Sequence, residues 1–320
     1  MPLLKKLRTL ACKLEATVGT AETLSATDGA FNAQNIMIQA DIDNLQRESS
    51  NTFGYLQSSQ GAQGGTCSFS TDLQLTDDTE PLWLSTLLQA CGYSVTASVF
   101  TPLSAGVTGS AGNGNKTVTI ASYQDGVKKY LAGAVGNFRI NAVSGRLVTI
   151  EWEFRGIWQT PVDAAMIVPT YPLDRPSRFA NSTITYNSVA QCVESVVFDA
   201  GNEIILRECP DTEAGYKSGL IVDRTPTISI NPEAQLVADE DRYGDWISGT
   251  EAPFSCDFIG NTGVGDSTPS SMTLAAPKAQ IVDIQESDRN GLVTDEVSLQ
   301  CNRNENNVDQ DVSISFTAAS

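Results

Sequence analysis

Residues 36–75 read IMIQADIDNLQRESSNTFGYLQSSQGAQGGTCSFSTDLQL, and their pattern recurs at residues 196–236 as VVFDAGNEIILRECPDTEAGYKSGLIVDRTPTISINPEAQL. Both segments hold an apolar triplet, an Arg-Glu pair, a Gly-Tyr pair and a final leucine at matching distances. The offset is 160 residues at Arg47 and Arg207 and becomes 161 at the Gly-Tyr pair, so one inserted residue keeps the segments aligned. An offset of half the 320-residue chain predicts two copies of one domain, because solenoid repeats are far shorter.

Each copy is expected to hold two strands joined by a long polar loop. Residues 66–75 alternate apolar and polar side chains, which is typical of a half-buried strand, and residues 227–231 do the same. We predict loops over residues 49–65 and 209–223, between the strands of each copy. Loops longer than about 12–15 residues are usually functional or disordered. Recurrence of the loop and its apolar side chains favour a function over a mobile hairpin tip.

The remaining pattern predicts a mainly β protein with ten or more strands. Residues 80–92 predict one good helix, with a proline at its start, a leucine stripe and a closing glycine. Asp125-Gly126 suits a type I′ hairpin turn, and a further hairpin follows it. We therefore predict two tandem sandwich or partial-barrel domains, each with at most one flanking helix. The expected boundaries are residues 1–160 and 183–320, with a proline-rich linker over residues 161–182.

Composition excludes several functional classes. The net charge is −18, and −16 of it falls after residue 160 (9 basic against 25 acidic residues), so phosphate neutralisation cannot hold nucleic acid. The chain has no histidine, which removes His-based triads. Its seven cysteines are odd in number and widely spaced, without a CxxC pair, so we predict reduced thiols and no zinc site. We expect no catalytic centre, no cofactor, no metal and no membrane segment.

Four stretches together resemble the tail tube proteins of tailed bacteriophages, in particular those of long non-contractile tails. They are a first strand ending in a Gly-Thr turn (11–20), the helix with its Cys-Gly end (81–92), the Asp-Gly hairpin (123–130) and a closing hairpin ending in Phe-x-Gly (136–158). The likeness covers the first half well. In the second half the helix is degraded and the Phe-x-Gly ending is missing.

The resemblance implies a structural virion protein whose subunits form stacked rings around a channel for the genome. Because rings with six such domains are usual in that family, two fused domains imply a trimer with pseudo-sixfold symmetry. The implied partners are further copies of the chain, the genome in transit, a tape-measure protein and tail-end proteins. The implied location is the virion tail, assembled in the cytoplasm of a bacterial host.

The polar faces of the two repeated strands are the candidate wall of the channel. Predicted lumen-facing residues are Ser68, Ser70, Asp72, Gln74, Ser229 and Asn231, with Glu151, Glu153, Asp295 and Glu296 of the closing hairpins as further candidates. Predicted contacts to a neighbouring ring or subunit are Tyr55, Leu56, Tyr216, Leu220 and Ile221. Two other classes stay open on the sequence alone. One is a secreted two-domain adhesin or carbohydrate-binding sandwich, and the other is a hydrolase with an acid pair.

Overall fold

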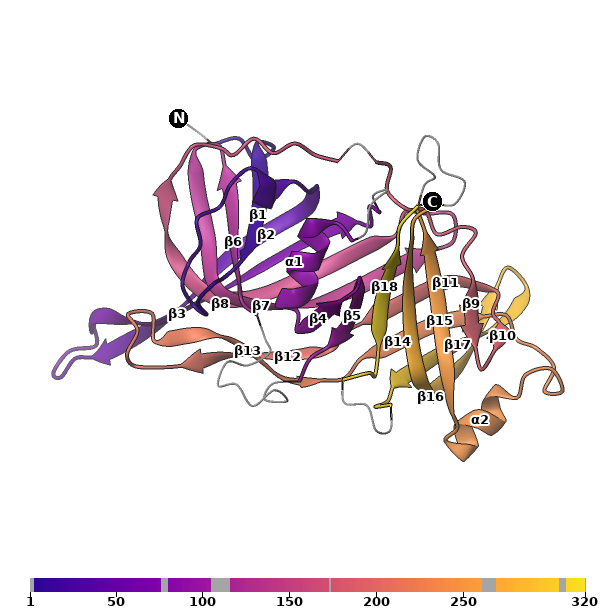
Figure 1. Ribbon diagram of the computed structural model, residues 1–320. Coiled ribbons are helices and arrows are strands. Elements are labelled where there is room, and N and C mark those ends of the chain that lie inside the picture. The colour runs from indigo at the N-terminus through magenta and orange to yellow at the C-terminus, as the bar shows by residue number, and fades with distance from the viewer. Residues whose placement is uncertain are drawn as a thin grey trace.

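The computed structural model describes residues 3–75, 80–104, 116–172, 174–260, 269–304 and 309–319, and it is mainly β. Eighteen strands occur within those ranges, with two short helices. Sixteen strands form one large antiparallel sheet, and β12 and β13 form a separate two-stranded ribbon. Figure 1 shows this sheet running across the whole molecule, with α1 over the first half and α2 at the far end of the second.

The elements have the following bounds. In the first half they are β1 (Arg8–Leu14), the 3-10 turn η1 (Thr27–Gly29), β2 (Ala33–Glu48), β3 (Tyr55–Asp72), α1 (Leu82–Ala90), β4 (Tyr93–Thr96), β5 (Val99–Pro102), β6 (Val118–Gln124), β7 (Val127–Val143) and β8 (Thr149–Asp163). In the second half they are β9 (Ile184–Tyr186), β10 (Val189–Ala190), β11 (Val193–Asp199), β12 (Asn202–Glu208), β13 (Tyr216–Arg224), β14 (Thr227–Pro232), α2 (Arg242–Ser248), β15 (Glu251–Ile259), β16 (Ser271–Arg289), β17 (Leu292–Cys301) and β18 (Ser313–Thr317).

The sheet repeats its strand order. Along the main path the strands run β2-β3-β8-β7 and then β11-β14-β17-β16. By the sequence repeat, β2 corresponds to β11 and β3 corresponds to β14. Each half then ends with its closing hairpin, β7–β8 in the first half and β16–β17 in the second. Even an irregularity is shared, because β2 shifts register on β3 between Gln34 and Met37, and β11 shifts on β14 between Val193 and Val196.

The halves are joined by hydrogen bonding between β7 and β11, so the sheet has no break at the midpoint of the chain. The predicted linker overlaps the end of β8, which extends to Asp163. Beyond it the described residues 164–172 and 174–183 carry no regular element, but this segment is not detached, since Phe179 is buried and Arg178 bridges to Leu147. The division into two tandem domains, with its boundaries, stays a prediction.

The core lies on one face of this sheet. Helix α1 buries Trp83, Leu84, Leu87 and Leu88 against it. An aromatic cluster continues beneath the helix, where the rings of Phe138 and Trp152 lie 5.5 Å apart. Members of this cluster also include Phe31, Phe69, Tyr93, Phe154 and Phe198. The helix predicted over residues 80–92 is confirmed, as Leu82–Ala90.

Two polar networks, one buried around Arg242 and one half-buried around Glu15, tie distant segments together. The Arg242 guanidinium, 5% exposed, contacts Asp295 at 2.8 Å and Glu240 at 2.6 Å, and it donates to the side-chain amide oxygen of Gln191 at 2.9 Å. The carboxylate of Glu15 accepts four hydrogen bonds, from Thr117 and Thr119 hydroxyls and from the backbone N–H groups of Gly19 and Gly133. Such groups are stable away from water only when their partners are present.

The predicted Asp125-Gly126 turn is confirmed, and a second turn of the same type joins β16 to β17. Asp125 and Gly126 have φ of 46° and 98° between β6 and β7, and Asn290 and Gly291 have φ of 56° and 87° between β16 and β17. These positive φ values are what a two-residue type I′ turn requires. The Gly/Ser/Thr-rich segments at residues 95–116 and 260–271 fall partly outside the described residues, and β4 and β5 occupy the start of the first one.

The predicted long polar loops are wrong over most of their length. Strand β3 begins at Tyr55 and pairs with β2 as far as Glu48, so only residues 49–54 form the turn. In the second half β13 begins at Tyr216 and pairs with β12, leaving residues 209–215 as the turn. Glycine, serine and glutamine are poor core formers, yet backbone pairing in a two-stranded ribbon needs no core.

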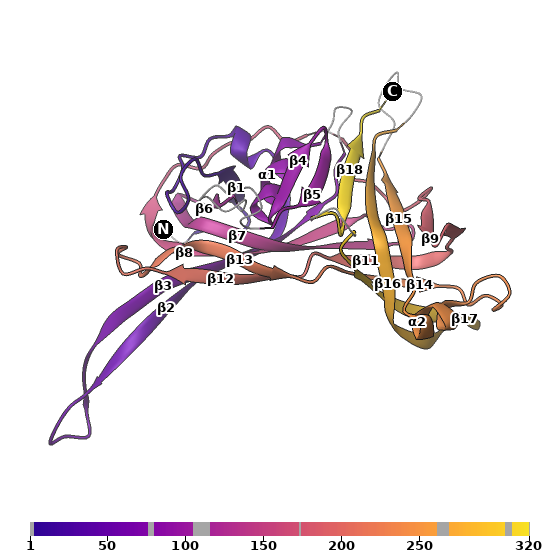
Figure 2. The same cartoon turned by 60° about the horizontal axis from the view of Figure 1, so that its bottom comes forward.

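The two ribbons have the same pairing but different surroundings. Glu48 lies opposite Tyr55 in the first and Glu208 opposite Tyr216 in the second. The β12–β13 ribbon packs on β7 and β8 of the first half, and a Cβ on Gly219 would meet the Gly133 carbonyl oxygen at 3.1 Å. The β2–β3 ribbon projects away from the body as a long arm (Figure 2). The arm, residues 41–63, is largely exposed.

Candidate functional site: the open face of the sheet

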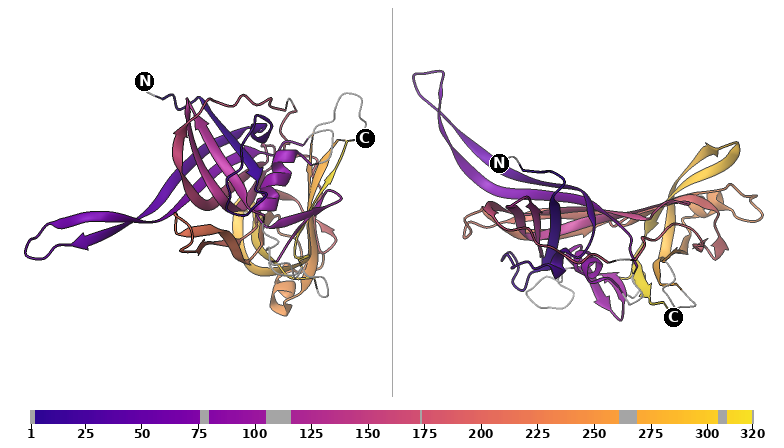
Figure 3. Two further views of the ribbon diagram at one scale, coloured as in Figure 1. Left: turned by 60° about the vertical axis from the view of Figure 1, so that its left-hand side comes forward. Right: turned by 90° about the horizontal axis from the view of Figure 1, so that it is seen from above.

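One face of the sheet is polar and uncovered. Figure 3 shows α1 and β1 on one side of the sheet, and the other side is uncovered except where the β12–β13 ribbon packs on β7 and β8. We call this uncovered side the open face. It carries Ser68, Ser70, Asp72, Asn137, Arg139, Asn141, Glu151, Glu153, Asp199, Ser229, Glu296 and Ser298.

Strand register places residues of both halves in continuous rows on this face. Directly paired residues of antiparallel strands point to the same side. One row runs Asp72, Thr149, Asn141, Val197, Ser229 and Ser298 across six strands. A parallel row runs Ser70, Glu151, Arg139 and Asp199. Side chains far apart in the sequence thus form one polar surface.

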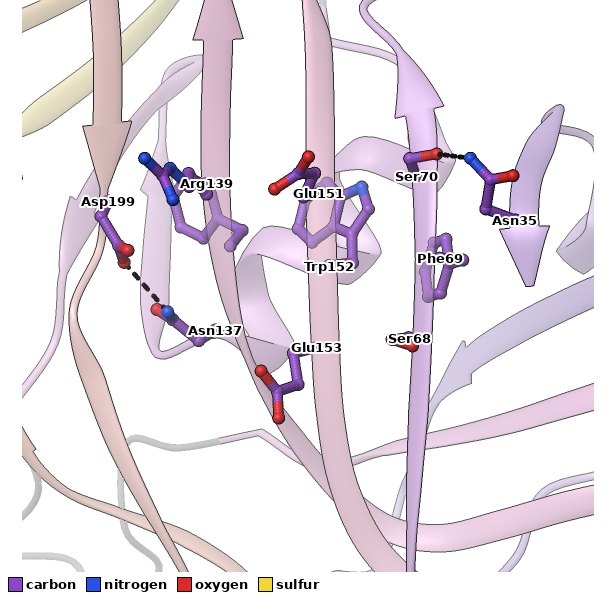
Figure 4. Close-up of a pocket in the computed structure, with 11 residues that line it drawn as sticks. Asn35, Ser68, Phe69, Ser70, Asn137, Arg139, Glu151, Trp152, Glu153 and Asp199 are labelled. Atoms are coloured by element: carbon purple, nitrogen blue, oxygen red, sulfur yellow. Dashed lines mark hydrogen bonds between the residues drawn. The ribbon is translucent and has the colours of Figure 1, made fainter. Parts of the chain in front are cut away.

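The open face is shallowly hollowed in two places. A hollow of about 420 Å³ lies over the first half, between Asn137, Glu151 and Glu153 (Figure 4). Within it the Asn137 amide donates to Asp199 at 3.0 Å and the Asn35 amide donates to Ser70 at 3.4 Å. A second hollow of about 260 Å³ lies over the second half, beside Ser229 and Glu296.

The charge of this face is mainly negative, and it lacks the features of a catalytic centre. The carboxylates of Asp72, Glu151, Glu153 and Asp199 outnumber Arg139 around the first hollow. The described residues contain no cluster of three or more potential metal ligands. Because the face is wide, shallow and acidic, it is suited to repelling a polyanion rather than to binding a small molecule.

The structure brings most of the predicted lumen residues together. Ser68, Ser70, Asp72 and Ser229 lie on the open face. Asn231 borders the second hollow, but its side-chain oxygen accepts from the backbone N–H groups of Glu194 and Ser195.

Two of the candidates have other partners. The Gln74 amide, beyond the end of β3, donates to the carbonyls of Pro172 and Asp174 and so fastens the linker segment. Asp295 points away from the open face, because it is 7% exposed and bound to Arg242. Asp295 and Glu296 are neighbours on β17, so alternation sets them on opposite faces, and only Glu296 lies on the open face.

The predicted contact residues lie on the two ribbons. Tyr55 and Leu56 are exposed near the end of the arm, and Phe53 at its tip is fully exposed. Tyr216, Leu220 and Ile221 are half-buried on the β12–β13 ribbon, which packs against the first half of the same chain. Sequence reasoning missed Phe53, Leu45 and Ile42, exposed apolar residues on the arm, because it did not predict that residues 41–63 form a paired ribbon.

Sequence reasoning also missed two free strand edges. Strand β2 pairs only with β3, and residues 281–289 of β16 pair only with β17 among the described residues. They are the two ends of the repeated strand path. Unpaired edges are ready templates for another strand, so proteins leave them open mainly where a partner is to be added.

Comparison with known proteins now decides the identity. A family model described as phage tail tube protein matches residues 6–318. The chain belongs to the phage tail tube protein family. No curated protein matches it.

Membership in the tail tube family establishes a structural, non-enzymatic component of the virion tail that assembles into a tube. The adhesin and hydrolase alternatives are thereby replaced. Within the described part of the chain no helix is long and apolar enough to span a membrane. All seven cysteines are unpaired, five of them buried, as the odd count and wide spacing predicted.

Proposed function

We propose that three copies of this tail tube protein close into a ring with pseudo-sixfold symmetry, and that stacked rings line a channel with the open face. The supporting observation is the β7–β11 junction, which joins the two halves edge to edge. By the repeat, β2 corresponds to β11 and β16 corresponds to β7, and these two strands have free edges at the ends of the repeated path. Adding copies by the same junction extends one sheet. Closure of that sheet removes every free edge.

The geometry of a closed ring suits a wide channel. Three copies of the eight-strand path give 24 strands. With strands about 4.8 Å apart and tilted by about 40°, the barrel measures about 48 Å across its backbone. Side chains of about 4 Å on each wall leave a bore of about 40 Å, which admits a hydrated double helix.

The chemistry of the open face supports passage without binding. Carboxylates and hydroxyls facing the bore keep a water layer and repel phosphates, so DNA gains no counterion release from contact. Lumen-facing roles are proposed for Ser68, Ser70, Asp72 and Ser229, together with Glu151 and Glu153. The genome, the tape-measure protein and the tail-end proteins are proposed partners.

The arm is proposed to contact a neighbouring copy. Its twin, the β12–β13 ribbon, already packs on the half of the sheet that precedes it. By the repeat, the arm extends over the second half of the adjacent subunit and buries Tyr55 and Leu56 there. Tyr216, Leu220 and Ile221 belong to the β12–β13 ribbon, which makes the equivalent contact within one chain. They are proposed to lie near the interface between copies in the ring.

Cryo-electron microscopy of tubes grown from the purified chain tests the ring. We expect threefold rings of three copies, a bore of about 40 Å and the open face inside. Rings of six copies, or the open face outside, would overturn the proposal. A variant with residues 43–62 replaced by Asn-Gly tests the arm. It is expected to fold, with unchanged circular dichroism, and to form no tubes, and tubes of normal length would exclude a role for the arm.

A further inference from the structure

The chain contains one example of an edge-to-edge junction between repeats, and its register is known. In this junction Ser195 to Asp199 of β11 lie antiparallel to Val143 to Arg139 of β7, with Phe198 opposite Ile140. On the open side the Asn137 amide donates to the Asp199 carboxylate at 3.0 Å, which locks the register. The contact is otherwise apolar on the core side.

The repeat transfers this register to the free edges. Ile38 corresponds to Phe198, because each lies opposite the matched residues Cys67 and Ile228. Ile284 corresponds to Phe138, because Ile284 lies opposite Val297 and Phe138 lies opposite Trp152, which occupy matching positions in the two closing strands. Residues 285–289 of β16 therefore stand where residues 139–143 of β7 stand. Neither segment contains a register shift against its closing strand.

The core-side positions differ in chemistry between the two junctions. Where β7 presents Ile140 and Ala142, β16 presents Glu286 and Asp288. Both carboxylates are exposed, and neither is in an ion pair with another described residue. Inward-pointing charges on an edge strand prevent pairing with wrong partners.

The matching edge is basic. A hollow of about 450 Å³ beside β2 is lined by Lys5, Lys6 and Arg8 together with β2 residues. Arg8 Nη1 donates to the Ile36 carbonyl at 2.5 Å, which holds the guanidinium at the edge of β2. Both lysines are exposed.

We propose that residues 285–289 of β16 pair antiparallel with residues 35–39 of β2 in a second copy, with Glu286 and Asp288 entering the basic hollow of Lys5, Lys6 and Arg8. The register sets Ile38 opposite Glu286 and Met37 opposite Ser287. It also sets the Gln39 amide near the Asp283 carboxylate. In the internal junction Asn137 of β7 donates to Asp199 of β11, so the donor and the acceptor would exchange strands in the contact between copies. This deepens the proposed function, on which it rests, by naming the contact that closes the ring.

The charged pairing explains why the chain does not use an apolar junction twice. An apolar free edge would aggregate before assembly, whereas the internal junction forms within one chain and is never exposed. Two carboxylates on one edge and three cations on the other also set the direction of addition, since like edges repel.

A cysteine pair tests the register in the full chain. In a Cys192→Ser background, Met37→Cys with Ser287→Cys places two thiols directly opposite on the open side, within the Cα separation that a disulfide spans. Mild oxidation of assembled protein is expected to give covalent dimers and trimers on a non-reducing gel. The control, Met37→Cys with Glu286→Cys, sets the thiols on opposite faces and is expected to stay monomeric. Tubes without trimer bands, or equal bands in the control, would overturn the register while leaving the ring intact.

Charge reversal tests the same contact without cysteines. Glu286→Lys with Asp288→Lys, and separately Lys5→Glu with Lys6→Glu, should raise the concentration needed for assembly at least about tenfold. All four changes in one chain should restore assembly to within about threefold of the natural chain. Asp174→Lys with Asp239→Lys matches the charge change of the first pair and should have little effect. If the variant with all four substitutions fails to assemble while the unaltered protein forms rings, the pairing is refuted. If the unaltered protein forms no rings, the proposed function is refuted instead.

Discussion

Replacing Thr71 by valine should destabilise the folded subunit through a single hydrogen bond. The Trp152 indole N–H donates to the Thr71 hydroxyl at 2.9 Å, and both residues are 2% exposed. Valine has nearly the shape of threonine, so Thr71→Val leaves the packing intact and strands the indole N–H away from water. Trp152 also lies at the centre of the aromatic cluster that supports the open face.

The expected loss follows from the cost of an unsatisfied buried donor, about 1–3 kcal/mol. Unfolding entropy of about 2.1 cal/mol/K per residue gives about 0.7 kcal/mol/K for this chain. The melting temperature should therefore fall by about 1.5–4 °C. Because assembly would add to apparent stability, the measurement needs unassembled subunits at low concentration.

Urea unfolding followed by tryptophan fluorescence and circular dichroism gives the free energy. Thr71→Ser, which keeps the hydroxyl, is the matched control and should lose less. Trp152→Phe and the double variant complete a thermodynamic cycle, in which a coupling of about 1 kcal/mol is expected. If the free energy of unfolding of Thr71→Val lies within about 0.3 kcal/mol of that of the natural chain, the hydrogen bond does not stabilise the fold. A coupling energy below about 0.3 kcal/mol would show the same.

Three further outcomes are expected. Arg242→Met leaves two buried carboxylates without their cation and should cost about 3–5 kcal/mol in urea unfolding, and a loss under about 1 kcal/mol would contradict this. Glu15→Ala removes the acceptor of four hydrogen bonds and should lower stability by more than about 2 kcal/mol, with faster hydrogen exchange at the freed N–H groups as the specific signature. Burial raises the pKa of the Cys67 thiol to about 12, so a thiol reagent at pH 8 should modify only Cys192 and Cys209 rapidly in the native protein and all seven thiols in urea. Rapid native modification of more than two thiols would show that the core opens.

Local features were predictable because short-range chemistry fixes them. The alternation in residues 66–75, the helix over 82–90 and the two Asx-Gly turns all depend on neighbours within a few residues. The repeat itself was visible as matched spacing. The candidate face was predictable in part, since period-two alternation separates Ser68 and Ser70 from Phe69 without reference to any other strand.

The sequence by itself determined a mainly β chain with an internal repeat, its turns and which side chains share a strand face. Only the tertiary structure decided that β7 joins β11, that residues 41–63 pair as an arm, and that one ribbon is packed while its twin projects. The reason is physical: pairing between distant strands depends on backbone hydrogen bonds and register, which every residue but proline can supply. Side-chain patterns reveal a buried face, but they leave open which edge that strand will meet.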